Sequence, residues 1–193
     1  MPNPEILVFG GSIRTGSLSA KLAALAAKEL AVLGADVTLI SLADYPLPIY
    51  NADIEKDEGY PENARKLAQL IARHQGVFIA TPEYNHSLPP LLKNAIDWAS
   101  RPGLAKEYKH RGRVYAIGSS SNGMVGGARA LIDLRKVLAT ALGAWVVPSQ
   151  VSISQAGSAF DDAGHLVAEP PADLLRSVCQ QLVAGAARFR PDD

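Results

Sequence analysis

Short apolar runs that alternate with amphipathic stretches constrain the fold of this chain more than any other feature. The runs are rich in β-branched and aromatic side chains and predict buried strands at residues 6–9, 37–40, 77–80, 114–117 and 145–147. Apolar residues at helical spacing predict helices at residues 18–33, 61–74, 90–100, 128–142 and 172–188. Strands that alternate with helices in this way are typical of a parallel sheet covered by helices.

We therefore predict an α/β fold: a doubly wound, five-stranded parallel sheet in the order 2-1-3-4-5, with helices on both faces. The chain has 193 residues, of which 48% are hydrophobic, and this is enough for one sizeable core. The sequence contains no internal repeat or linker, so residues 1–193 are expected to form one domain. Residues 45–58, 104–112 and 154–171 are expected to be loops, and residues 151–153 are a possible extension of the last strand.

The charge balance and the single cysteine exclude several classes of partner. Lys and Arg together number 19, as do Asp and Glu, so neither nucleic acid nor an anionic membrane is an expected partner. No apolar stretch approaches the ~18 residues of a membrane span, and the first residues do not resemble a signal peptide. Cys179 cannot form an intrachain disulfide and is expected in the core of the last helix. These features predict a cytoplasmic protein without a metal site.

Three polar loops follow predicted strands at their carboxyl ends: residues 10–19, 81–88 and 118–127. Ligands of an open parallel sheet bind at this edge, where the strand order reverses. The first loop carries Ser12, Arg14 and Ser17 immediately before a helix, where backbone N–H groups and the helix dipole favour a phosphate. The alternative is a tight turn in which Ser17 merely caps the helix, but this does not explain Arg14.

The first loop lacks the sequence motifs of the commonest nucleotide-binding sites. Gly11 and Gly16 have the spacing of a P-loop, but Ser17-Leu18 stands where Lys and Ser/Thr are required. The G-x-G-x-x-G dinucleotide pattern is absent, and the second strand ends at Ile40-Ser41 without the acid that would hold a ribose. A mononucleotide such as FMN is the best remaining candidate.

The second and third loops offer walls for a flat ring. The Asn85 amide could hydrogen-bond the edge of a heterocycle, and Tyr84 could pack on its face. His86 is expected to be a surface histidine or one bonded to a carbonyl rather than a proton donor, and Glu83 a structural hydrogen-bond acceptor rather than a base. The third loop, residues 119–127, either borders the ligand or is a mobile surface loop.

Together these loops resemble the NADPH-dependent FMN reductase family. The resemblance is carried by Gly11-Ser12-Ile13-Arg14-x-x-Ser17, by Thr81-Pro82-Glu83-Tyr84-Asn85-His86-Ser87-x-Pro89 with Leu92-Lys93-Asn94-Ala95-Ile96-Asp97-Trp98, and by Gly126-Gly127-x-Arg129. It implies a flavodoxin-like fold and an FMN-dependent oxidoreductase with NADPH or NADH as electron donor. Quinones, azo dyes, chromate or free flavin would accept the electrons in a ping-pong reaction. The resemblance also implies a homodimer or homotetramer, with the helix at residues 90–100 in the dimer interface.

The resemblance assigns the cofactor contacts residue by residue, while no side chain is expected to be catalytic because the chemistry belongs to the flavin. The FMN phosphate would contact Ser12, Arg14, Ser17 and Ser19, with Gly11 and Leu18 beside them. The isoalloxazine and ribityl groups would contact Pro82, Glu83, Tyr84, Asn85 and Ser87, with His86 beside them. The remaining side would be closed by Ser119, Ser120, Ser121, Asn122 and Gly123.

Two other functions fit the same loops. One is a flavin-binding electron carrier or redox sensor without turnover, although the zero net charge does not favour a carrier that docks through charge. The other is a non-flavin phosphate-binding regulatory domain. The basic residues Arg101, Lys106, Lys109 and Arg111 could meet an anionic nucleotide, but a solvated loop face is the expected explanation for them.

Overall fold

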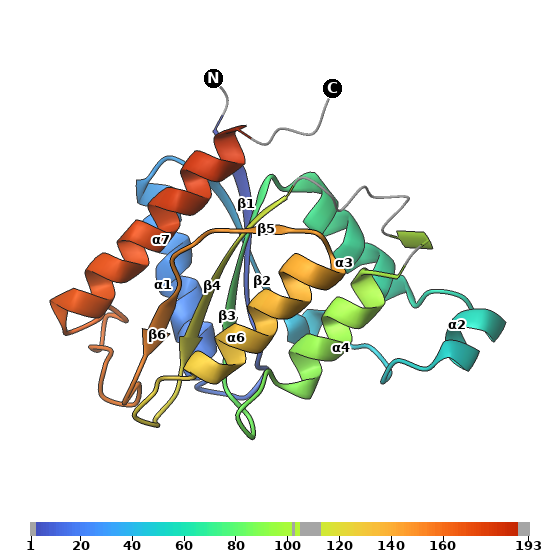
Figure 1. Ribbon diagram of the computed structural model, residues 1–193, viewed down its shortest axis with the longest axis horizontal. Helices are drawn as coiled ribbons and strands as arrows, with labels where there is room; N and C mark the ends of the chain where they lie inside the picture. The colour runs from blue at the N-terminus through green and yellow to red at the C-terminus, as the bar shows by residue number, and fades with distance from the viewer. Residues whose placement is uncertain (1–2, 102, 105–112, 189–193) are drawn as a thin grey trace.

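A parallel sheet forms the centre of the computed structural model, which describes residues 3–101, 103–104 and 113–188 (Figure 1). Its strands are β1 Glu5–Gly10, β2 Asp36–Ser41, β3 Gly76–Thr81, β4 Val114–Ser120, β5 Trp145–Val146 and β6 Val151–Ile153. They follow the order β2-β1-β3-β4-β5, and β6 pairs with β4 beyond β5. The predicted strand order is therefore confirmed.

Helices cover both faces of this sheet. The helices are α1 Leu18–Val32, α2 Ala52–Asp57, α3 Glu62–Arg73, α4 Pro90–Ala99, α6 Ala128–Lys136 and α7 Glu169–Arg188, with 3₁₀ turn η1 Leu42–Asp44 and π turn η2 Val137–Ala141, and α2 contributes no buried side chain. Figure 1 shows α1 and α7 on one side of the sheet and α3, α4 and α6 on the other. Among the described residues, no helix is both long enough and apolar enough to cross a bilayer.

Alternation along the strands divides the core into two layers. Ile6 and Val8 point toward α1 and α7 and pack in one apolar cluster, which also contains Cys179. Leu7 and Phe9 point the other way, into a cluster formed with α3, α4 and α6. The expected burial of Cys179 is confirmed, and burial raises the pKa of its thiol to about 12.

The last predicted strand is divided into β5 and β6. Pro148 lies between them and has no N–H group to donate to β4. Arg135 of α6 satisfies the carbonyl groups at this break, because its guanidinium donates to the oxygens of Val147 at 2.9 Å and of Pro148 at 3.3 Å. On this side β4 is consequently paired at both ends, with β5 at Val114 and Tyr115 and with β6 from Gly118 to Ser120.

Three expectations about element bounds were wrong. Helix α2 occupies part of the region expected to be a loop, since the Asn51 side chain accepts from the Asp53 N–H group and caps it. Helix α7 begins at Glu169, before the expected start, because prolines fit the first turn of a helix. β4 continues to Ser120, although Ser119 and Ser120 were expected in a loop. Of the loop expected at residues 104–112, residues 105–112 lie outside the described part of the chain.

Candidate functional site

The loop between β1 and α1 forms the first wall of a cavity at the carboxyl edge of the sheet. Its start is tied to β3, because the Gly11 N–H group donates to the Ala80 oxygen at 2.7 Å. A Cβ atom at Gly11 would lie 3.1 Å from the Leu92 side chain, so the close approach of α4 favours glycine there. Its end is the N-cap of α1, where the Ser17 hydroxyl accepts from the Ala20 N–H group at 3.3 Å.

Several donors of this loop are available to a ligand. Within the described part of the protein, no acceptor is bonded to the N–H groups of Ser12, Ile13, Thr15 and Gly16. The exposed Arg14 guanidinium has one long contact, 3.5 Å from the Gly16 oxygen. A free cation and free N–H groups at the start of a helix form a site for an anion, most naturally a phosphate.

Residues of all three loops line the cavity at this edge. Its volume is about 140 Å³, and it is lined by Ser12, Arg14, Ser17, Leu18, Ser19, Pro82, Glu83, Tyr84, Ser120 and Ser121. All of these are residues that the sequence predicts to bind the cofactor. The other predicted residues do not line it: Gly11, Asn85, His86, Ser87, Ser119, Asn122 and Gly123.

Ser120, which lines the cavity, carries an unpaired hydroxyl. Its side chain is almost fully buried, and its Oγ atom has no hydrogen-bond partner in the described structure. A buried hydroxyl without a partner costs ~1–3 kcal/mol. This cost makes Ser120 a candidate partner for a ligand in the cavity.

The second loop is a tight hairpin turn rather than an irregular segment. Tyr84 and Ser87 exchange two backbone hydrogen bonds of 3.0 Å, and Asn85 and His86 between them have φ angles of 49° and 64°. The Ser87 hydroxyl donates to the Asp133 carboxylate of α6 at 2.6 Å, which anchors the turn. The Tyr84 side chain is left half exposed beside the cavity.

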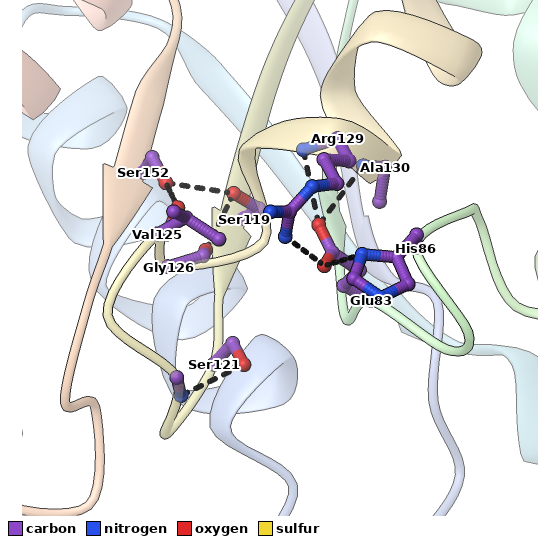
Figure 2. A network of polar contacts seen from close by, with 10 residues as sticks. Glu83, His86, Ser119, Ser121, Val125, Gly126, Arg129, Ala130 and Ser152 are labelled. Atoms are coloured by element: carbon purple, nitrogen blue, oxygen red, sulfur yellow. Dashed lines mark hydrogen bonds and ion pairs between the residues drawn. The ribbon is translucent and has the colours of Figure 1, made fainter.

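Glu83 joins this turn to α6. Its carboxylate accepts from the N–H groups of Arg129 at 3.0 Å and Ala130 at 3.2 Å, as Figure 2 shows. The structure thus places Glu83 in the structural role expected from the sequence. His86 lies on the exposed side of Glu83, with its Nδ1 atom 4.0 Å from the carboxylate and its side chain 72% exposed.

The third loop is held in place by the segment that contains β6. The buried Ser119 hydroxyl donates to the Gly126 oxygen at 2.8 Å, and the Ser152 hydroxyl donates to the Val125 oxygen at 2.9 Å (Figure 2). The Asn122 side chain accepts from the Gly157 N–H group at 2.8 Å. Ser119 and Asn122 therefore shape the loop, while Ser120 and Ser121 face the cavity. Sequence reasoning missed this supporting role of β6, because three residues after a proline give only a weak strand signal.

The chain matches a known protein family over most of its length. A family model described as NADPH-dependent FMN reductase matches residues 4–158. A quinone reductase of Escherichia coli K12 is 39% identical over 135 residues, which are 69% of each chain. An NAD(P)H-dependent FMN reductase of Pseudomonas aeruginosa is 35% identical over 187 residues, covering 96% of this chain and 97% of that one.

A solved structure supports the fold over nearly the whole chain. The flavoenzyme NAD(P)H:(acceptor) oxidoreductase FerB of Paracoccus denitrificans superposes with a TM-score of 0.75 and 29% identity, covering 96% of this chain and 98% of that one. The matched region contains all three loops of the cavity and the strands that carry them. This chain therefore belongs to the NADPH-dependent FMN reductase family and is an oxidoreductase that uses FMN and NAD(P)H.

Proposed function

We propose that this protein binds FMN in the cavity between the three loops and passes electrons from NAD(P)H to quinones or similar acceptors by a ping-pong reaction. Azo dyes, chromate and free flavin are the other acceptors we propose. Relatives named quinone reductase support the choice of a quinone as the acceptor. The observation that carries the location of the site is the unpaired Ser120 hydroxyl, which is buried beside the same cavity as Arg14.

The residues present fit a flavin mononucleotide with its phosphate at the first loop. Arg14 supplies a permanent positive charge, and the free N–H groups of Ser12, Ile13, Thr15 and Gly16 supply neutral donors. The hydroxyls of Ser17 and Ser19, 2.9 Å apart, share one hydrogen bond and leave one O–H group for the ligand. The protein therefore offers the phosphate one positive charge and several neutral donors at the start of α1.

The remainder of the cavity is suited to orient a flat ring at its rim. Its 140 Å³ lies below the ~300 Å³ of common small-ligand sites, so a whole flavin would extend past it toward the half-exposed Tyr84. Two hydrogen bonds to α6 fix the turn that carries Tyr84. The Glu83 carboxylate accepts from the Arg129 N–H group, and the Ser87 hydroxyl donates to the Asp133 carboxylate. A rigid turn beside the ring sets the ring's orientation without taking part in bond changes.

When bound, FMN supplies the chemistry of accepting a hydride and releasing electrons. The side chains around the cavity include hydroxyls, an arginine and a glutamate that is already bonded to α6. Their roles in this proposal are to bind and to orient, and the open side at Tyr84 admits donor and acceptor in turn. This shared access is the physical basis of the ping-pong order.

We also propose that the chain is a single-domain, cytoplasmic homodimer or homotetramer. The small volume of the cavity supports an oligomer, because a second subunit would complete the wall over a ring that extends past the rim. A sheet with strands from Glu5 to Ile153 supports one domain, and one buried cysteine fits a reducing compartment. Light scattering of the purified protein measures the oligomeric state directly.

Steady-state kinetics with NADH and NADPH against a panel of quinones, an azo dye, chromate and free FMN test the reaction. Parallel double-reciprocal lines and acceptor-dependent oxidation of the nicotinamide are expected. Intersecting lines would exclude the ping-pong order, and oxidation that does not depend on any acceptor would exclude the reductase. Tyr84→Ala is expected to change the visible spectrum of bound flavin and the turnover more than the folding. Tyr84→Phe, which keeps the ring, serves as the control.

A further inference from the structure

A second hollow lies beside the phosphate loop, between α1 and the edge strand β2. Its volume is about 420 Å³, within the ~300–1,000 Å³ range of small-molecule sites. Ser12 lines both this hollow and the cavity of the candidate FMN site. The two spaces therefore meet at the loop between β1 and α1, the proposed phosphate loop, so a ligand in the hollow would lie next to bound FMN.

The walls of this hollow suit a flat, uncharged ring. Small residues, Gly10 at the end of β1 and Ala20 and Ala23 on α1, line its α1 side. Leu39 of β2 lines the opposite side and is 50% exposed. It packs in none of the apolar clusters of the core, so its exposed surface is available to a ligand.

The end of the hollow at β2 is polar and bears one negative charge. Asp44 is the sole charged residue among the described residues that line it, and no hydrogen bond or ion pair within residues 3–101, 103–104 and 113–188 occupies its carboxylate. The Ser41 hydroxyl accepts from the Ala43 N–H group at 3.2 Å and keeps its own proton for donation. A ligand with vicinal hydroxyls can therefore donate to Asp44 and accept from Ser41, whereas a phosphate would be repelled.

We propose that this hollow binds the adenosine end of NADH, and that Asp44 selects the free ribose 2′-hydroxyl against the 2′-phosphate of NADPH. An acid that follows the second strand of an open parallel sheet recognises a ribose diol in this way. Asp44 lies three residues beyond the end of β2, in the turn η1, so the strand end itself contains no acid. The proposal rests on the proposed function, since it concerns the electron donor of that reaction.

Ligand binding to the FMN-loaded protein tests the proposal, because bound FMN blocks the phosphate loop. The probes are 5′-AMP and adenosine 2′,5′-bisphosphate, which differ only by the 2′-phosphate, titrated by calorimetry. 5′-AMP is expected to bind at least about tenfold more tightly, because a hydrogen bond to a charged group is replaced by charge repulsion. Asp44→Asn is expected to remove most of this difference. Asp53 is an exposed acid on α2 outside the hollow, so Asp53→Asn is the control. This variant is expected to retain the difference in affinity between the two probes.

A second variant tests the apolar wall independently. Leu39→Thr removes the apolar side chain but places a β-branched residue, which favours strands, on the edge strand, and it is expected to weaken both probes by a similar factor. In kinetics, Asp44→Asn is expected to raise the KM for NADH and lower the KM for NADPH, with kcat unchanged for both. Equal affinity of the two probes for the unaltered protein, or an unaltered ratio in Asp44→Asn, would overturn the proposal. Either result would leave FMN binding and the reduction of bound FMN by NAD(P)H unaffected. Those two measurements test the proposed function separately.

Discussion

The Glu83 carboxylate accepts a hydrogen bond from the Arg129 backbone N–H group at 3.0 Å, across 46 residues of sequence. The N-cap residue of α6, Gly127, has no side chain that could cap the helix, and it has a φ angle of 88°. Glu83 replaces the missing cap and accepts from Ala130 as well. The turn beside the cavity and the first turn of α6 therefore form one rigid unit.

Glu83→Ala is expected to lower the free energy of unfolding by ~1–2 kcal/mol, the usual effect of losing a helix cap. Glu83→Gln keeps one acceptor oxygen for the N–H groups of α6 and is expected to lower the free energy of unfolding by less than Glu83→Ala does. Urea unfolding of both variants, followed by circular dichroism, measures the difference. Equal losses in the two variants would show that the charge, and not the cap, is the stabilising feature.

Arg14→Ala is expected to weaken FMN binding roughly ten- to hundredfold, because one charge-assisted contact is worth ~1.5–3 kcal/mol. Lys21→Ala removes an exposed positive charge from the first turns of α1, outside the residues that line the cavity, and is the control. Fluorescence titration of the apoprotein with FMN gives both affinities. If the two variants lose the same affinity, the effect of Arg14 is a general charge effect rather than a contact.

Ser120→Ala is expected to have effects of opposite sign on stability and on cofactor binding. Without FMN the variant should be at least as stable as the natural protein, since a buried unpaired hydroxyl is removed. Its affinity for FMN should fall, since the ligand loses a partner.

Ser119→Ala is the matched control for Ser120→Ala. The Ser119 hydroxyl is bonded to the Gly126 oxygen, so its loss should cost ~1 kcal/mol of stability. Thermal melting and FMN titration of both variants separate the two roles. Destabilisation of the apoprotein by Ser120→Ala would contradict the unpaired state of that hydroxyl.

Ser87→Ala is expected to change how stability depends on pH. The Ser87 hydrogen bond, followed by the one from Lys136, lowers the pKa of Asp133 from its ordinary value of 3.8. A carboxyl group with a lowered pKa in the folded state stabilises the fold above its ordinary pKa and loses this effect as the pH falls through the lowered value. Ser87→Ala should therefore lower the free energy of unfolding by its largest amount at pH 6, and by less as the pH falls below 3.8.

Ser100→Ala provides the control for this pH dependence. The Ser100 hydroxyl donates to a backbone carbonyl, the Asp97 oxygen, which does not titrate. The small effect of Ser100→Ala on the free energy of unfolding should be the same at every pH. Urea unfolding between pH 3 and pH 7 gives both curves, and a loss in Ser87→Ala that does not vary with pH would refute the role of the Ser87–Asp133 bond.

The sheet could be predicted from the sequence because its strands are buried on both faces and stand out as apolar runs. Ile6 to Phe9 and Val77 to Ala80 show this directly, since each run supplies residues to both core layers. The loop between β1 and α1 was equally visible, because the Ser17 side chain caps the helix that begins at the next residue. Structural roles that depend only on neighbouring residues in the chain can be recognised from a short stretch of sequence.

The remaining features depend on contacts between distant segments. Ser119 and Ser120 lie in a strand because β6 pairs with them, and no apolar pattern marks them. Helix α2 is capped by Asn51 but contributes no buried side chain, so it lacks an apolar face that a sequence could show. Asp44 reaches the hollow beside β2 through the turn η1, and only the folded chain brings it beside Ala23.

Anaerobic reductive titration of the purified, flavin-loaded protein tests the central claim most directly. Addition of NADH or NADPH should bleach the visible flavin absorbance, and a quinone added afterwards, still without oxygen, should restore it. An absorbance that neither nicotinamide changes, or a bleached protein that no quinone, azo dye or chromate re-oxidises, would contradict the account.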